Sequence, residues 1–242
     1  MRYDMSYYKI LFVLLAFAFV TYTSYSDQRS YVWTYEYMIM EPGRAEIEQY
    51  TTFSTANVDD YANNVMTDLN VELEVGMNPH YDFAVYQNFK QSADGSIKYD
   101  GFKLRTRIKI GEKDQFFMDP LIYIEYIGKA NMSKHAFEPK LILAKDFGKF
   151  NISINPYCEI EQEGSSDWQL HWKYAVGVNY KLFPLLTLGI ESKGDEYAKY
   201  LGPTIGHGTQ HIWCAFGVLH GIGNIKERSP KFLARLLLGV HL

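Results

Sequence analysis

Cysteine is scarce in this chain of 242 residues, which contains only Cys158 and Cys214. A disulfide framework is therefore excluded at this size, and no closely spaced pair proposes a zinc site. Both cysteines fall on the apolar faces of strand-like runs, where a free cysteine behaves as a small hydrophobic residue. A formal net charge of only −4 gives no sign of a polyanion-binding surface. We predict no metal, no cofactor and no nucleic-acid partner.

Long apolar runs are also missing beyond the N-terminal region, and no stretch has the periodicity of a useful amphipathic helix. The one apolar run, residues 10–20, follows Arg2 and Lys9 and precedes small and polar residues, which is the layout of a secretory signal peptide. An uncleaved membrane helix is the alternative, but the run is short for spanning a bilayer. We assign residues 1–26 to a cleaved signal peptide and residues 27–242 to one domain.

The chain is rich in aromatic residues and in strand-like alternation. Aromatics make up 16% of the residues, which fits β-structure and also the aromatic girdles of membrane barrels. Residues 102–110 place apolar side chains on one face of an extended strand and basic side chains on the other, because strand side chains alternate with a period of two. About a dozen runs share this pattern, so we predict an all-β domain.

The pattern leaves the number of strands open. The first expected strand is the Tyr- and Trp-rich run at residues 30–40, which a turn at residues 41–43 would connect to the next strand. Counting every hairpin gives about 13 strands, whereas single-chain bacterial barrels have an even number. Either residues 30–40 do not span, or a strand has been split or merged elsewhere. We predict about 12 strands, within a range of 10–14.

Two architectures fit one apolar and one polar face on every strand. A soluble β-sandwich buries the apolar faces between its sheets, whereas an outer-membrane barrel turns them toward lipid and encloses the polar faces. The second is favoured by the signal peptide, by runs of about 9–12 residues, by short turns alternating with longer polar loops, and by aromatic residues at the ends of apolar faces. We therefore predict a transmembrane antiparallel up-and-down β-barrel.

Short motifs carry a family resemblance. The hairpin Glu138-Pro-Lys-Leu-Ile-Leu-Ala-Lys-Asp-Phe-Gly148, the sequence Tyr200-Leu-Gly-Pro203 followed by Trp213, and the closing strand resemble Gram-negative outer-membrane β-barrels of a porin-like or transporter-like kind. The resemblance covers nearly all of the mature chain. It implies a place in the outer membrane, contact with its lipid, and recognition by the outer-membrane insertion machinery through the C-terminal strand. It also implies a narrow channel or transporter for small solutes.

Charged residues on the polar faces are the candidate lumen lining, and they are unevenly distributed. One hypothesis is a pore in which an acidic wall faces a basic wall and selects solutes by charge and size. The alternative is that acidic and basic side chains pair between neighbouring strands and largely fill a narrow barrel. The candidates are Glu46, Glu48, Glu72, Glu74, Lys103, Arg105, Arg107, Lys109, Glu125, Glu138, Lys140, Glu159, Glu161, Lys173, Glu191 and Arg235.

Two other functions stay open. A lipid-modifying outer-membrane enzyme would need a nucleophile beside a histidine, and His171, His207, His211 and His220 are the candidates for that histidine. No nucleophile motif accompanies them, so we predict no catalytic residues and no enzyme. The other is a structural or plugged barrel without transport.

Overall fold

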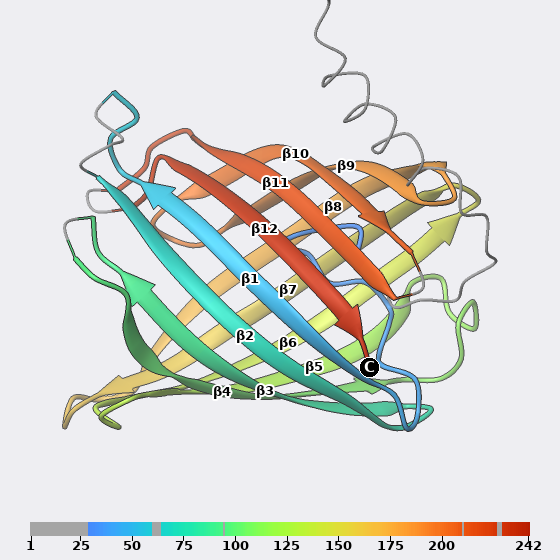
Figure 1. Cartoon of the computed structure of the whole chain (residues 1–242), viewed down its shortest axis with the longest axis horizontal. Helices are drawn as coiled ribbons and strands as arrows, with labels where there is room; N and C mark the ends of the chain where they lie inside the picture. The colour runs from blue at the N-terminus through green and yellow to red at the C-terminus, as the bar shows by residue number, and fades with distance from the viewer. Residues whose placement is uncertain (1–28, 60–63, 94, 210, 227–228) are drawn as a thin grey trace, which may run out of the picture.

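A computed structural model describes residues 29–242, apart from 60–63, 94, 210 and 227–228. The described chain forms one closed antiparallel barrel in which every strand pairs with its sequence neighbours and β1 closes onto β12 (Figure 1). No helix in this part of the chain is long and apolar enough to span a membrane. The strands are β1 (Ala45–Thr55), β2 (Val65–Asn78), β3 (Tyr81–Gln91), β4 (Lys98–Lys109), β5 (Asp119–Lys129), β6 (Lys134–Phe147), β7 (Phe150–Glu163), β8 (Gln169–Phe183), β9 (Leu186–Gly194), β10 (Lys199–Gly208), β11 (Ile212–Ile222) and β12 (Phe232–His241).

The predicted all-β barrel of 12 strands is confirmed. The strands run from 9 residues in β9 to 15 in β8, somewhat beyond the expected upper length. Their pairing follows chain order all the way round, so the topology is the up-and-down meander that the sequence pattern indicated. The signal-peptide prediction for residues 1–26 lies outside the described residues.

The alternating side chains place apolar groups on the exterior. Along β9 and β10, Ile190 and Leu201 are 58% and 45% exposed, while Glu191 and Tyr200 beside them are 1% and 5% exposed. A soluble sandwich would bury the aliphatic side chains and leave the carboxylate in water. This barrel has the opposite arrangement, which is the one that suits a surrounding of lipid.

The two ends of the barrel differ. At one end, here called the short-turn end, β2, β6 and β8 turn tightly into the next strands, and the Leu242 N–H donates to the carbonyl of Ala45 at 2.9 Å. At the other, the loop end, the longest connections are residues 56–64 and 223–231. Alternation of short and longer connections is not strict, because residues 110–118 form a longer connection at the short-turn end.

The expected first strand at residues 30–40 is wrong. Residues 29–40, here called the lumen segment, are extended but pair with no strand, and they lie inside the barrel as the blue trace in Figure 1. Tyr31 and Val32 are both 0% exposed, so the segment is covered on all sides. Its sequence pattern resembles that of a strand because the segment is extended and its aromatic side chains are packed. Side chains of the barrel wall form hydrogen bonds with its backbone N–H and C=O groups.

β1 continues to Thr55 and β2 begins at Val65, where the two strands pair. One other expected connection differs from the structure. The turn at residues 41–43 connects the lumen segment to β1 instead of joining two strands. There the Gly43 N–H donates to the carbonyl of Gly76 at 2.9 Å.

Candidate functional site

The lumen segment is held by a carboxylate of the barrel wall. Glu191 on β9 accepts hydrogen bonds from three consecutive backbone N–H groups, those of Val32 at 2.6 Å and of Trp33 and Thr34 at 2.8 Å each. An extended segment without a strand partner must satisfy its backbone groups elsewhere, because a buried unpaired N–H is costly. Glu191 therefore replaces a neighbouring strand over the middle of the segment.

Further wall residues bind the segment on either side of its middle. The Tyr35 N–H donates to Asn155 Oδ1 at 2.6 Å, and its carbonyl accepts from Asn155 Nδ2 at 3.0 Å and from the hydroxyl of Ser153. The Met40 N–H donates to both Glu74 at 3.2 Å and Asp82 at 3.1 Å. The segment is thus fixed to walls on opposite parts of the ring, β7, β9 and the β2–β3 pair.

Glycines on the inner face make room for the segment. A Cβ added at Gly177 on β8 would lie 2.4 Å from a ring carbon of Tyr31, and one at Gly217 on β11 would lie 2.5 Å from a methyl of Val32. At Gly206, close to the short-turn end of β10, it would lie 3.1 Å from the Arg29 carbonyl oxygen. The segment consequently starts toward the short-turn end and returns there at Met40.

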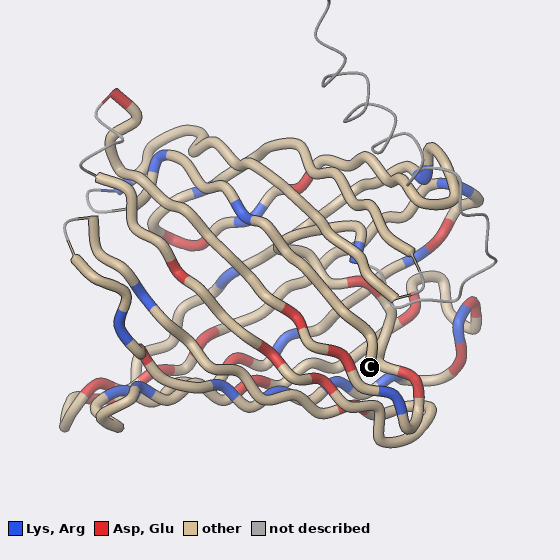
Figure 2. Tube along the Cα trace, viewed as in Figure 1, with Lys and Arg blue, Asp and Glu red and all other residues tan. Residues whose placement is uncertain are grey.

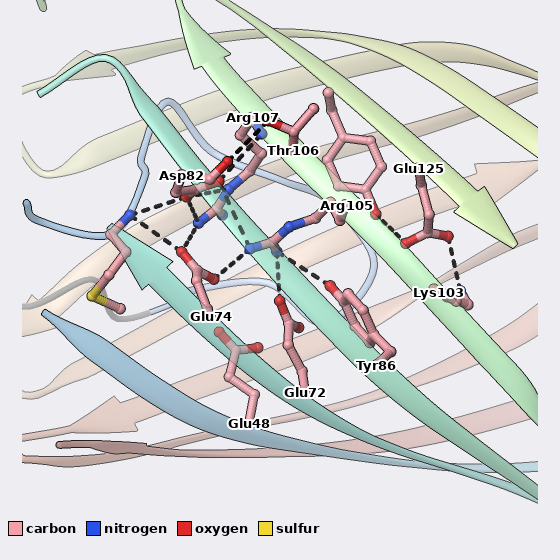
Figure 3. Close-up of polar contacts among 12 residues, drawn as sticks. Glu48, Glu72, Glu74, Asp82, Tyr86, Lys103, Arg105, Thr106, Arg107 and Glu125 are labelled. Carbon is pink, nitrogen blue, oxygen red and sulfur yellow. Dashed lines mark hydrogen bonds and ion pairs between the residues drawn. The ribbon is translucent and has the colours of Figure 1, made fainter. Parts of the chain in front are cut away.

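A five-residue arginine cluster lies on the wall beside the end of the segment (Figure 3). Arg105 contacts Glu72 at 3.0 Å and Glu74 at 2.6 Å. Arg107 Nε donates to Asp82 Oδ2 at 2.9 Å, and its Nη2 also reaches Glu74. All five side chains are nearly completely buried. Buried charges need such partners, because one left alone would lose its hydration without compensation.

The register explains how the cluster forms within one wall. Glu74 on β2 and Arg105 on β4 both pair with Ala84 on the intervening β3. The small Ala84 side chain leaves space for the two long side chains to meet above it. Figure 2 shows the acidic positions following one another along neighbouring strands. Glu72, Glu74 and Arg105 therefore pair along the wall and do not face each other across the lumen.

Two more of the predicted acidic residues lie on β1. The Tyr50 hydroxyl donates to Glu72 at 2.7 Å and to Glu48, while Arg29 of the lumen segment donates to the Tyr50 oxygen at 3.1 Å. Glu46 accepts from the indole N–H of Trp213 and lies 3.1 Å from a ring nitrogen of His241. Tyr50 thus extends the arginine cluster to β1 and the lumen segment, while Glu46 forms a second polar group with β11 and the C-terminal strand.

The other predicted residues form local pairs around the ring. Lys109 lies over the Tyr37 ring at 5.3 Å, and Lys140 lies over the rings of Tyr35, Tyr123 and Tyr157 at 4.7, 4.4 and 4.4 Å. The ion pairs are Lys103–Glu125 at 2.9 Å, Lys140–Glu138 at 3.1 Å, Lys173–Glu159 at 2.8 Å and Lys134–Glu161 at 2.5 Å. A role for these residues in moving a solute stays a prediction.

A cavity of about 300 Å³ lies in the loop-end half of the lumen. Arg235 on β12 lines it and also touches the lumen segment, since Nη1 donates to the Val32 carbonyl at 3.2 Å and the guanidinium lies 5.0 Å from the centre of the Trp33 ring. Arg235 therefore lies between the cavity and the lumen segment. Its lining is Thr52, Asp68, Asn70, Asn88, Phe89, Asp100, Lys103, Ile127, Gly128, Lys129, Lys134, Ala136, Glu159 and Arg235.

The rim of the loop end carries a further polar network. His171 on β8 makes a hydrogen bond of 2.7 Å to Glu196 and lies 3.9 Å from Glu161, which pairs with Lys134 of the cavity lining. Hydrogen bonds from His171 and Tyr197 hold the pKa of the Glu196 carboxyl below its usual range. This network joins the loop between β9 and β10 to the wall of the cavity.

The histidines considered for catalysis do not gather. His207 and His220 lie near opposite ends of the β10–β11 pair, and both are exposed, while His171 lies on the rim network. His211 is exposed in the turn before β11. Among the described residues no group of histidine, cysteine and carboxylate side chains could hold a metal ion.

Sequence reasoning missed several residues that matter here. Asp82 completes the arginine cluster, Tyr50 and Arg29 connect it to the lumen segment, and Lys193 lies on the inner face of β9. Asp82 lies between Tyr81 and Phe83, and Lys193 lies two positions after Glu191, so the alternation places both on polar faces. Nothing in the pattern separated them from polar residues outside the site.

A closed barrel with an even number of strands, an apolar exterior and an ionic interior is the architecture of outer-membrane β-barrels. No protein-family model and no curated protein matches the chain.

Solved outer-membrane channels share the fold at low sequence identity. The KdgM porin in complex with disordered oligogalacturonate has a TM-score of 0.58 and 8% identity, covering 81% of this chain and 97% of that porin. The NanC porin has a TM-score of 0.59 and 12% identity, covering 81% of this chain and 100% of that chain. An outer membrane channel from Pseudomonas putida F1 has a TM-score of 0.59 and 12% identity, covering 85% and 98%. The chain thus has the porin-like fold of the outer membrane.

Proposed function

We propose that the protein is an outer-membrane channel or transporter for small solutes with a charged lumen. Solute enters the cavity at the loop end, and the lumen segment narrows the path toward the short-turn end. The observation that carries the proposal is the polar cavity of about 300 Å³ enclosed by a barrel whose exterior is apolar. The shared fold with the KdgM and NanC porins supports transport.

The proposal includes an orientation. Outer-membrane barrels keep their short turns in the periplasm and their longer loops outside the cell. The short-turn end then faces the periplasm, and the described chain begins on that side at Arg29. Insertion through the C-terminal strand would use β12, which closes the barrel against β1.

Planar-bilayer recordings test this function. The full-length mature protein is expected to give discrete current steps, and vesicles containing it should swell in small neutral sugars. If the protein gives no current and the vesicles do not swell, a structural barrel without transport is the better account. Fatty-acid release from the same vesicles, lost in H207A or H211A, would instead support a lipid-modifying enzyme.

A further inference from the structure

Most charged groups around the cavity are neutralised by a partner. The carboxylates that line it would repel an anion, but each has a basic neighbour. These pairs are Asp100 with Lys129 at 2.6 Å, Glu159 with Lys173 at 2.8 Å and Asp68 with Lys90 at 3.9 Å. The lining lysines Lys103 and Lys134 are paired as well, with Glu125 and Glu161. Any charge that remains unpaired therefore dominates the recognition of a solute.

Arg235 lines the cavity, and its positive charge is not neutralised by an ion pair. Its Nε donates to the Thr52 hydroxyl at 2.8 Å and its Nη1 to the Val32 carbonyl at 3.2 Å, and both acceptors are neutral. In the part of the chain that the structure describes, no carboxylate forms an ion pair with this guanidinium and Nη2 has no hydrogen-bond partner. A guanidinium removed from bulk water is stabilised by an anion that its fork can bind with two parallel hydrogen bonds.

Lys193 adds a second positive charge in the same region. It points inward from β9 between Ala175 and Tyr200, diagonal to Lys173 on the same face of β8. Within the described residues its ammonium forms no hydrogen bond or ion pair. Glu138 and Asp195 act on it from longer range, as do the positive charges of Lys173 and Arg235. Lys173 is neutralised by Glu159 at 2.8 Å, and Glu191 acts on Arg235 from longer range. Lys193 and Arg235 are thus two cations of this part of the lumen without an ion pair among the described residues, and Lys193 lies outside the lining of the cavity itself.

We propose that Arg235 and Lys193 form a subsite for a small organic anion, a carboxylate or phosphate ester that also carries hydroxyl groups. Thr52, Asn70 and Asn88 in the lining supply neutral hydrogen-bonding groups for the hydroxyls. A cavity of about 300 Å³ is at the lower end of ligand pockets, which suits a single-ring solute. The inference rests on the proposed function only for entry of the solute from the loop end.

Calorimetric titration of the detergent-solubilised mature protein tests the subsite with glucuronate, glucose 6-phosphate and glucose. One or both anions should bind, and which of them binds more tightly distinguishes carboxylate from phosphate preference. Glucose, which lacks the charge, should bind at least about tenfold more weakly, because a charge-assisted hydrogen bond contributes that much to affinity. Equal binding of glucose, or no binding of either anion, overturns the proposal.

Variants assign the binding to the two residues. R235Q should weaken anion binding by about tenfold or more, and R235K should lose less because it keeps the charge. K193Q should also weaken it without disturbing the fold, since Lys193 forms no structural hydrogen bond among the described residues. The matched control is K199Q, an exposed lysine at the loop end of β10. Unchanged anion affinity in K193Q and R235Q overturns the assignment.

The two proposals fail separately. A protein that conducts and admits neutral sugars but does not bind the anions would retain the channel function and lose the subsite. A protein that binds the anions without conducting would retain the subsite and lose the channel.

Discussion

Glu191 on β9 holds the backbone of Trp33, whose N–H donates to its Oε2 at 2.8 Å across 158 positions of sequence. The carboxylate also binds the N–H groups of Val32 and Thr34, and it is 1% exposed. Hydrogen bonds to an ionised acceptor are about twice as strong as neutral ones. This contact is therefore expected to set the position of the lumen segment and with it the width of the path.

E191Q should loosen the lumen segment. The amide keeps one oxygen but loses the charge and turns an NH₂ group toward backbone donors, so part of the three-fold contact is lost. We expect larger or more frequent current steps than in the unchanged protein, measured in planar bilayers. E112Q, at an exposed residue of the connection before β5, is the control and should conduct as the unchanged protein does. Identical currents in E191Q would show that this contact does not restrict the path.

G177A should displace the segment by steric means. The added methyl would lie 2.4 Å from the Tyr31 ring, too close for any Cβ contact, whereas Gly95 has no atom nearer than 3.6 Å to such a methyl. We expect G177A to raise the conductance while G95A does not. Unchanged conductance in G177A would mean that Tyr31 can be packed elsewhere without opening the lumen.

R105M should destabilise the barrel strongly. It leaves Glu72 and Glu74 buried with one cation fewer, and removing one partner of a buried ion pair costs about 3–5 kcal/mol. The free energy of unfolding from lipid vesicles in urea measures this loss. K98M, at the exposed first residue of β4, should change the free energy of unfolding little. Equal losses in the two variants would argue that the arginine cluster is solvated.

I190R tests which face meets lipid. Ile190 is in the middle of β9 on the outer face, and an arginine there should cost about 2–4 kcal/mol if that face lies in the bilayer. The same urea titration applies, with V58R in the connection between β1 and β2 as the control. An unchanged unfolding free energy for I190R would place the aliphatic side chains outside the hydrocarbon region.

The strand pattern predicted the barrel well because local chemistry decides it. A run such as residues 102–110 has one apolar and one basic face whatever its neighbours are, and the even strand number follows from closure. The charged positions were also predictable, since inward and outward residues alternate. Their partners were not, because the pairing of Glu74 with Arg105 depends on the register with Ala84 on the strand between them.

The lumen segment was missed for a physical reason. Residues 30–40 are extended and aromatic, as a strand would be, and the groups that satisfy their backbone lie far along the chain at Asn155 and Glu191. Two sequence signals pointed to it. One was the odd count of about 13 strands. The other was glycine at inward positions such as Gly177 and Gly217, since an empty lumen would have room for larger side chains there.

The most direct test of the account compares the single-channel conductance of the mature protein with that of a variant lacking residues 29–40. If the lumen segment narrows a lipid-embedded pore toward its short-turn end, the shortened barrel should conduct several-fold more current than the complete one. Equal conductance in the two proteins, each shown to be folded in the membrane, would contradict it.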